Sequence, residues 1–348
     1  MKEKRLDYEV LRLIAIVGVV FNHTSGRGFD LYMAEGCSGI NYVGSLLLGI
    51  LCKIAVPLFF LVSGGLLLAK EERIRTVLVK RVLRILLALV IFSGVLYLFW
   101  IRWDYVTKAG VQDFLSRLWS TGVSIPYWYL YAYLGILLML PLLRAMVKAM
   151  SDMAFVYLAF VHILLYGVLG TAAFCLKLGP LHSDFLIPLA EPCLFYFIMG
   201  YYLSHRFSWE LMRKKDLGFL WGIALLSLAI MFALADADVG RNGTVTINYL
   251  ESLMVFPVFA VYATVHQLFT WHRPPQWVAK TITALGGCVF GTYLLEGILR
   301  YELGFIYQFL EPRIHVLPAC MVWVAVVVVC GLSITWVLKK IPGLKKIL

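Results

Sequence analysis

The sequence predicts an all-α fold, a polytopic bundle of about ten transmembrane helices. Hydrophobic residues make up 61% of the 348-residue chain, charged residues only 15%, and the mean hydropathy is +0.85. A soluble domain carries about 25% charged residues. Apolar runs of about 17 to 25 residues recur along the chain, which is the length a helix needs to span a bilayer. These runs do not alternate apolar with polar residues, so a membrane barrel of strands is not expected.

The apolar runs define the expected helices in chain order. The first follows a short basic stretch, MKEKR, and no small-residue cleavage site comes after it, so we expect an uncleaved first helix. The connections are short, which predicts a single transmembrane domain over residues 1–348. Within the longest connection, VQDFLSRLWS has the pattern of an amphipathic helix on the outer interface. The expected spans are 8–25, 44–68, 82–101, 127–147, 154–175, 187–204, 217–235, 249–270, 281–300 and 316–338.

The distribution of lysine and arginine predicts the orientation of the bundle. If the N-terminus is cytoplasmic, the cytoplasmic loops and ends carry 21 basic residues and the opposite side carries 8. Basic residues concentrate on the cytoplasmic side of membrane proteins, so we expect both termini to be cytoplasmic. The net charge of +11 arises from these loops. Because no nucleic-acid-binding module is recognisable, the expected partner is the lipid bilayer and not a nucleic acid.

The first expected helix, YEVLRLIAIVGVVFNHT, carries Arg12 near one end and His23 near the other. Ionisable residues inside a membrane are costly and usually functional. Eleven residues at about 100° each place the two side chains on one face of a helix, about 16 Å apart along its axis. Both can therefore line one cavity. Two structural alternatives stay open: Arg12 can extend its charge to the membrane boundary, and His23 can be a hydrogen-bonded structural histidine.

A second group of polar residues follows in VPLFFLVSGGLLLAKEERIRTVLVKRVLRI. Pro57 interrupts the second span, and Ser63 and Gly64 lie toward its cytoplasmic end. Such residues are tolerated in spanning helices where the backbone borders a cavity. Arg81 and Arg84 follow, three residues apart, at the cytoplasmic boundary. Guanidinium groups match phosphate geometry, which indicates a phosphorylated ligand. The alternative is ordinary positive charge that contacts lipid headgroups.

Lys53 is a charged residue inside the second span, at a depth similar to that of His23. An intramembrane lysine needs a partner, and Glu296 in the ninth span is a candidate partner for Lys53 or His23. A structural ion pair without a chemical role is the alternative. Aromatic residues crowd the outer end of the fourth span, among them Trp128 and Tyr131. An aromatic belt at the membrane interface explains most of this cluster, and aromatic faces also bind sugar rings.

Together these segments resemble the bacterial acyltransferase-3 family of integral-membrane acyltransferases that modify cell-surface sugars. The resemblance rests on RLDYEVLRLIAIVGVVFNHT with its Arg12 and His23, on VPLFFLVSGGLLL, on the Arg81-x2-Arg84 pair, on YWYLYAYLGILLMLPLLR and on FGTYLLEGIL. It covers essentially the whole chain. Family members often carry a histidine at the end of the last motif, where this chain has Glu296. Many relatives add an extracytoplasmic domain, so we expect transfer here to be completed within the membrane core.

The resemblance implies a role for each matching residue. His23 is the implied catalytic histidine, and Arg12 is its partner on the first helix. Arg81 and Arg84 are implied to hold acyl-CoA from the cytoplasmic side, with Ser63 and Gly64 along the path of its pantetheine arm. The residues expected to support His23 or to face the acceptor are Asn22, Lys53, Trp128, Tyr131 and Glu296. The implied location is the bacterial cytoplasmic membrane.

The expected reaction moves an acyl group, acetyl first of all, from cytosolic acyl-CoA to a hydroxyl of a cell-surface or lipid-linked carbohydrate. His23 can act as a general base or carry the acyl group itself, and the sequence leaves both routes open. No permanently bound cofactor is expected. The histidines show no metal-ligand spacing, so no metal site is expected either. The competing interpretations are a transporter or flippase of a glycan or lipid-linked precursor, and a non-catalytic membrane sensor.

Overall fold

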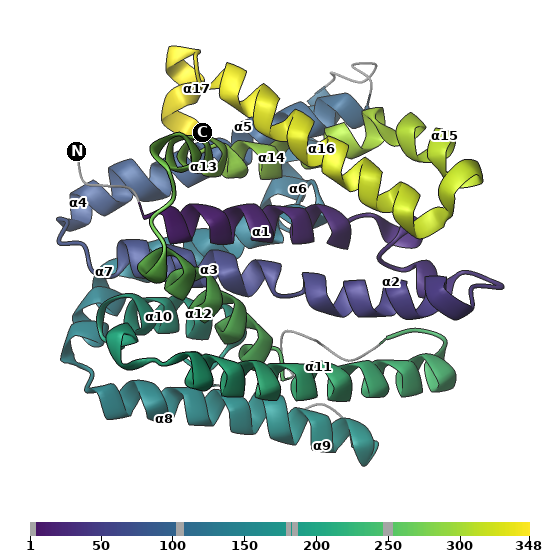
Figure 1. Ribbon diagram of the computed structural model, residues 1–348. Helices are drawn as coiled ribbons and strands as arrows, with labels where there is room; N and C mark the ends of the chain where they lie inside the picture. The colour runs from purple at the N-terminus through teal and green to yellow at the C-terminus, as the bar shows by residue number, and fades with distance from the viewer. Residues whose placement is uncertain (1–4, 102–107, 179–181, 183–186, 246–252) are drawn as a thin grey trace.

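The computed structural model describes residues 5–101, 108–178, 182, 187–245 and 253–348, and it contains helices and no strand over these ranges (Figure 1). The predicted all-α class is therefore confirmed for the described part of the chain. The first nine α-helices are α1 Leu6–Asn22, α2 Gly39–Cys52, α3 Ala55–Leu67, α4 Ile74–Val77, α5 Leu83–Trp100, α6 Lys108–Trp119, α7 Trp128–Ala149, α8 Asp152–His162 and α9 Gly170–Cys175. The next eight are α10 Pro192–His205, α11 Lys214–Asn242, α12 Val255–Trp271, α13 Gln276–Gly286, α14 Val289–Glu302, α15 Gly304–Ile314, α16 Val316–Leu338 and α17 Pro342–Ile347.

Several helical segments are long and apolar enough to cross a membrane, so the protein is a multi-pass membrane protein. Six described segments meet this criterion, and the bent pair α13–α14, with 54° between its halves, makes a seventh. Helices α1, α10 and α12 have 17, 14 and 17 residues and are shorter. The count of ten crossings stays a prediction, and residues 249–252 of the eighth expected span lie outside the described ranges.

The second expected span is broken into α2 and α3 at Lys53 and Ile54. Pro57 lacks an N–H group, so it cannot donate to the carbonyl four positions earlier, which is that of Lys53. At the break, the backbone N–H groups donate to the carbonyl three residues earlier and not four. These hydrogen bonds run from Lys53 N to Ile50 O at 3.1 Å and from Ile54 N to Leu51 O at 3.3 Å. Irregular backbone inside a membrane is tolerated where it borders protein or a cavity. The break therefore marks a position of functional interest.

Helix α1 lies in the middle of the bundle (Figure 1), where it packs against α2, α3, α12, α13, α14 and α16. Its inward residues are apolar and fully buried, for example Leu11, Ala15 and Ile16. Such burial on several sides is typical of a helix that is apolar nearly all round. The central helix is also the one that carries Arg12 and His23, so the fold places both residues inside the protein and not against lipid.

Helices α3 and α10 cross at very short range because each contributes a glycine to the contact. A β-carbon at Gly64 would overlap the carbonyl of Phe197, and one at Gly200 would overlap the carbonyl of Leu61. Small residues allow this close approach of backbones in membrane helices. Gly64 is therefore a packing residue in the structure, and it points toward α10.

The start of α1, the end of α16 and helix α17 lie at the same end of the bundle, at the left of Figure 1. Both ends of the described chain are thus on one face of the bundle. The positive charge of the loops predicts that this face is cytoplasmic, which stays a prediction. We call it the entry face, and we call the opposite end, where α1 ends at Asn22, the far face.

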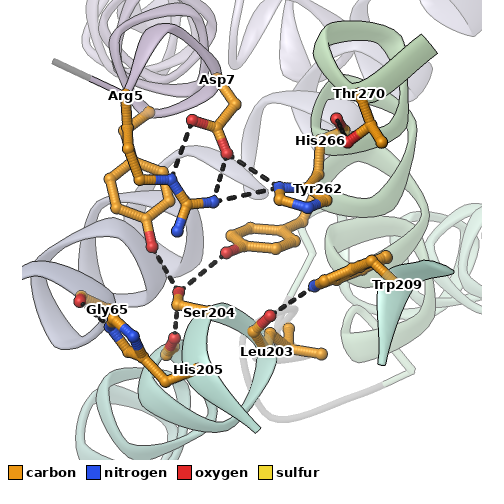
Figure 2. A network of polar contacts seen from close by, with 12 residues as sticks. Arg5, Asp7, Gly65, Leu203, Ser204, His205, Trp209, Tyr262, His266 and Thr270 are labelled. Atoms are coloured by element: carbon orange, nitrogen blue, oxygen red, sulfur yellow. Dashed lines mark hydrogen bonds and ion pairs between the residues drawn. The ribbon is translucent and has the colours of Figure 1, made fainter. Parts of the chain in front are cut away.

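A polar network fixes the start of α1 to α10 and α12 at the entry face (Figure 2). Asp7 is 2.5 Å from the guanidinium of Arg5 and 2.9 Å from His266 Nδ1. Tyr8 donates a hydrogen bond to Ser204, which in turn donates to the carbonyl of Gly200. Buried polar groups are costly unless they are hydrogen-bonded, so this network holds the first turn of α1 in one position.

Candidate functional site

A cavity of about 410 Å³ opens along α1 between its two ends. At the entry-face end it is lined by Arg12, Arg84 and Lys339, and at the far-face end by Asn22 and His23. The structure therefore brings Arg12 and His23 to one cavity, as the helical spacing predicts. The remaining lining residues are Val19, Lys53, Val56, Phe59, Ser63, Ile85, Pro126, Trp128, Tyr129, Tyr133, Gly286, Gly287, Val289, Phe290, Tyr293 and Leu348.

His23 ends α1 and faces a buried carboxylate. Its Nδ1 lies 3.0 Å from Glu296 Oε1, and the Glu296 side chain is only 2% exposed. The distance is that of an ion pair, but the ring N–H does not point along the line of an ideal hydrogen bond. Nδ1 faces Glu296. The other ring nitrogen, Nε2, has no hydrogen-bond partner among the described residues, and His23 lines the cavity. A histidine held by a carboxylate at one nitrogen can exchange a proton at the other.

Arg300 connects Glu296 back to His23. Its Nε lies 2.5 Å from Glu296 Oε2, and its Nη1 donates a hydrogen bond to the backbone carbonyl of His23. Both carboxylate oxygens of Glu296 are thus occupied, one by each partner. The carbonyl of His23 belongs to the last turn of α1, which leaves backbone acceptors free, and a cation there is favourable. Arg300 therefore fixes the position of the carboxylate and of the histidine backbone together.

The cavity is strongly cationic. Arg12, Lys53, Arg84 and Lys339 contribute to its lining, and no aspartate or glutamate is among the lining residues in the described part of the chain. Glu9 lies behind Arg12, with 3.2 Å between Oε2 and Nη1. Positive charges that gather in a water-restricted space attract an anionic ligand. Such a lining is suited to anionic ligands.

One wall of the cavity is aromatic. Tyr129 and Tyr133 stack with 5.7 Å between their rings, and both lie beside Ser63 in the lining. Tyr293 packs against Tyr129 at 5.9 Å and donates a hydrogen bond of 2.6 Å to the carbonyl of Pro126. These aromatic side chains form an apolar wall of the cavity. An extended chain with few charges fits along this wall.

The paired arginines take different partners. Arg84 lines the cavity and donates to the carbonyls of Ile347 at 2.9 Å and Leu348 at 2.8 Å. Arg81 is not in the cavity lining, and its Nη2 lies 2.8 Å from Glu72 Oε1. A π-helical segment, Leu78–Val82, precedes α5 and contains Arg81. Of the two arginines, Arg84 is therefore the one that faces the cavity.

Glu72 forms a clamp between Arg81 and Arg144 in the loop before α4. Its Oε2 lies 2.9 Å from Arg144, whose Nε also donates to the carbonyl of Leu67 at 3.0 Å. The hydrogen bond from Arg81, followed by that from Arg144, lowers the pKa of Glu72 to about 2. The carboxylate is therefore ionised at neutral pH. This clamp joins α3, α7 and the segment that leads into α5.

The other predicted site residues divide between the cavity and its surroundings. Asn22, Lys53, Ser63 and Trp128 belong to the lining. Tyr131 is outside it and donates a hydrogen bond of 2.7 Å to the carbonyl of Leu118 in α6. Gly64 is outside it as well, at the contact between α3 and α10 described above. Glu296 stands behind His23 and does not pair with Lys53.

Sequence reasoning missed Arg300, Lys339 and the tyrosine pair Tyr129–Tyr133. Arg300 stands four residues after Glu296, so the helical spacing of a salt bridge was visible in EGILR. The tyrosines were visible only as part of an aromatic cluster that a membrane interface also explains. Lys339 reaches the cavity because α16 returns to the entry face, and its Nζ donates to the carbonyl of Gly287 at 2.7 Å.

A comparison with protein families assigns the chain to a family. The acyltransferase-3 family model, described as an acyltransferase domain, matches residues 5–338. The chain belongs to the acyltransferase-3 family. An acyltransferase-3 protein is a membrane acyltransferase, so it works in a lipid bilayer on an acyl donor and an acceptor. The matched range includes Arg12, His23, Arg84 and the Glu296–Arg300 pair, whereas Lys339 and Leu348 of the cavity lining lie beyond it. No curated protein and no solved structure matches the chain.

Proposed function

We propose that this acyltransferase-3 protein moves an acyl group, acetyl first of all, from cytosolic acyl-CoA to a hydroxyl of a cell-surface or lipid-linked carbohydrate. The observation that carries the proposal is the single cavity that has Arg84 and Lys339 at one end and His23 at the other. Acyl-CoA has a phosphorylated end and a thioester end joined by an extended pantetheine arm. The cavity has a cationic end, an aromatic wall and a histidine in the same order.

The donor enters from the entry face in this proposal. Its phosphates bind near Arg84, Arg12 and Lys339, with Arg81 at the border of the site. Guanidinium groups bind phosphate oxygens in a two-pronged geometry, and lysine adds a point charge. The pantetheine arm then follows Ser63 and the tyrosine pair. The separation of Arg12 and His23 along α1, about 16 Å by helical rise, is of the order that this arm bridges.

The chemical step takes place at His23. In the direct route, the acceptor oxygen bonds to the acyl carbon and the carbon–sulfur bond breaks. The hydroxyl proton passes to His23 Nε2 and from there to the thiolate of CoA. In the two-step route, Nε2 bonds to the acyl carbon, the carbon–sulfur bond breaks and CoA leaves as its thiolate. The acceptor oxygen then bonds to the acyl carbon, the carbon–nitrogen bond to His23 breaks, and the hydroxyl proton passes to the thiolate. In both routes Glu296 faces Nδ1, stabilises positive charge on the ring and keeps Nε2 toward the reaction.

The direct test uses the full chain purified in lipid nanodiscs. Free thiol released from acetyl-CoA is measured for the wild type and His23→Ala, and mass spectrometry of surface glycans from cells with and without the protein identifies the acceptor. We expect thiol release that depends on His23 and an acetyl group on one glycan. A folded wild-type protein that releases no thiol, and whose loss leaves the glycans unchanged, would favour the transporter alternative.

The two chemical routes are separated by a trapping experiment. The protein is mixed with labelled acetyl-CoA without acceptor, quenched and analysed by peptide mass spectrometry. A label on His23 that hydroxylamine removes identifies an acyl-histidine intermediate. Label-free His23 in a preparation that transfers acetyl when acceptor is added identifies the direct route.

A further inference from the structure

Lys53 is a cation inside the bundle without a matching carboxylate. It occupies the break between α2 and α3, lines the cavity and is half-buried. No carboxylate of the described residues lies at ion-pair distance from its ammonium group. Asp30, in the loop after α1, interacts with it electrostatically from farther away. Charged residues within a membrane normally have a close partner, because the uncompensated charge is costly.

Glu296 cannot be this partner, since its two oxygens face His23 and Arg300. What Lys53 contacts is the ring of Phe29, with 4.5 Å from Nζ to the ring centre. An aromatic face stabilises a cation only in part. The ammonium group is thus positioned on one side and left open on the side of the cavity.

A second polar atom next to Lys53 also lacks a partner. Asn22 Nδ2 donates to the carbonyl of Cys52 at 3.1 Å, which fixes the orientation of the amide. Its Oδ1 is buried and has no hydrogen-bond partner. Asn22 also lines the cavity and precedes His23. A buried acceptor without a donor is costly, so such an atom indicates a ligand group that donates to it.

We propose that the far-face end of the cavity binds an acceptor with an anionic group, a carboxylate or a phosphate, which pairs with Lys53 while a hydroxyl of the same acceptor donates to Asn22 Oδ1. This inference rests on the proposed function, because the bound molecule is an acceptor only if the protein transfers an acyl group. The position of Lys53 decides the assignment, because it lies with Asn22 and His23 at the end of the cavity opposite Arg84 and Lys339. The donor phosphates have their own cations at the entry face.

The test measures binding by thermal unfolding of the full chain in nanodiscs at constant ionic strength. Three probes are compared: methyl β-D-glucuronide with a carboxylate at C6, glucose 1-phosphate with a phosphate at C1, and the neutral methyl β-D-glucoside. A ligand that binds the folded state raises the unfolding temperature. We expect at least one of the two anionic probes to bind about tenfold or more tightly than the neutral one, as an additional charge-assisted hydrogen bond allows. The glucuronide and the phosphate distinguish a uronic acid from a phosphorylated carrier.

Matched variants assign the effect. Lys53→Gln should remove the preference for the anionic probes, and Lys53→Arg should keep it. Lys177→Gln, at an exposed lysine beyond α9, should not change it. Equal binding of charged and neutral probes by the wild type would overturn the proposal, and so would a preference that survives in Lys53→Gln. If Lys53→Gln does not fold, the wild-type comparison and Lys53→Arg still decide.

A titration with CoA completes the experiment. The stabilisation by CoA should be unchanged in Lys53→Gln. A loss of CoA binding there, with the sugar preference intact, would place Lys53 in the donor site and overturn the inference. Thiol release from acetyl-CoA, measured on the same preparations, keeps the two proposals separate. No release in the presence of the acceptor glycan, together with charge discrimination, refutes acyl transfer alone, whereas release without discrimination refutes the anion site alone.

Discussion

His23 at the end of α1 and Glu296 in α14 meet with 3.0 Å between Nδ1 and Oε1, and this contact joins two helices that are far apart in the sequence. The carboxylate is buried and held from behind by Arg300. The imidazole, in contrast, borders the cavity. The arrangement is a buried carboxylate beside a histidine that borders the cavity, and such a carboxylate can set which ring nitrogen carries the proton.

The first prediction concerns this carboxylate. Glu296→Gln keeps the size of the side chain and removes its charge, so it no longer stabilises a protonated imidazole. We expect the rate of acetyl transfer to fall by about 10²-fold or more, the range for loss of general acid–base function. The measurement is kcat and kcat/KM for thiol release by the purified protein.

Glu302→Gln is the matched control, because Glu302 ends the same helix and is exposed. It should leave the rate within about twofold of the wild type, as surface substitutions usually do. Equal activity of Glu296→Gln and the wild type would contradict a role of the carboxylate in the reaction. A fall that is matched by a lower unfolding temperature would assign Glu296 to structure alone.

The second prediction concerns Arg84 at the entry face. In the structure its guanidinium bonds to the carbonyls of Ile347 and Leu348 while it lines the cavity. Arg84→Gln removes the charge that attracts phosphate, so we expect KM for acetyl-CoA to rise by about 10- to 100-fold. Steady-state kinetics over a range of acetyl-CoA concentrations measures this.

Lys80→Gln, an exposed cation one turn earlier, serves as the control for general charge. It should change KM by about twofold at most if the effect is local. An unchanged KM in a folded Arg84→Gln protein would exclude Arg84 from the donor site. The unfolding temperature of each variant shows whether the contact to the last helix is needed for stability.

The sequence predicts those parts of the fold that depend on local patterns. The last expected span and α16 have the same bounds, Val316–Leu338, because an uninterrupted apolar run is followed by Lys339 and Lys340. The second span was expected as one helix, but it is broken at Lys53. Pro57 gives the cause of the break, since its missing N–H frees a carbonyl one turn earlier. The exact position of the break along the span depends on the packing of α2 and α3 against α1.

In the candidate site, too, local sequence patterns predict some features and tertiary packing decides the others. Arg12 and His23 share a cavity because helical spacing alone puts them on one face. The choice of Glu296 between Lys53 and His23 could not be read from the sequence, because it depends on where α14 packs against α1. The approach of Lys339 and Leu348 depends on the return of α16 to the entry face. Tertiary contacts of this kind leave no local pattern.

The third prediction concerns the pH dependence of stability through Glu72. Its folded-state pKa is lowered to about 2 from an ordinary value of 4.5. A lowered pKa means that the ionised clamp stabilises the protein fully above the unfolded-state pKa and is lost as the pH falls through the folded-state value. Glu72→Gln should therefore cost about 1 to 3 kcal/mol at neutral pH. The difference from the wild type should shrink as the pH falls from about 5 toward 2.

Thermal unfolding in detergent at several pH values tests this, with Glu71→Gln as the neighbouring control. Glu71 pairs with Lys148 at 2.7 Å, but its side chain is 83% exposed, so its substitution should have little effect. A stability difference for Glu72→Gln that stays constant down to the lowest pH would contradict the ionic origin of the clamp.

The fourth prediction concerns the crossing of α3 and α10. Gly64→Ala places a methyl group where the carbonyl of Phe197 stands, and the backbone cannot retract because Gly200 meets Leu61 in the same way. Overpacking of this kind costs about 1 to 3 kcal/mol. We therefore expect a lower unfolding temperature, measured in detergent or nanodiscs, and a loss of activity that follows the fraction of folded protein.

Gly135→Ala in α7 is the matched control, because a β-carbon at Gly135 has no neighbour within 4 Å. Alanine is the better helix former by about 1 kcal/mol, so this variant should be as stable as the wild type or more stable. If Gly64→Ala is as stable as Gly135→Ala but has a higher KM for acetyl-CoA, Gly64 acts on the donor path, as the sequence motif implies. If both stability and KM are unchanged, neither the packing role nor the donor role holds.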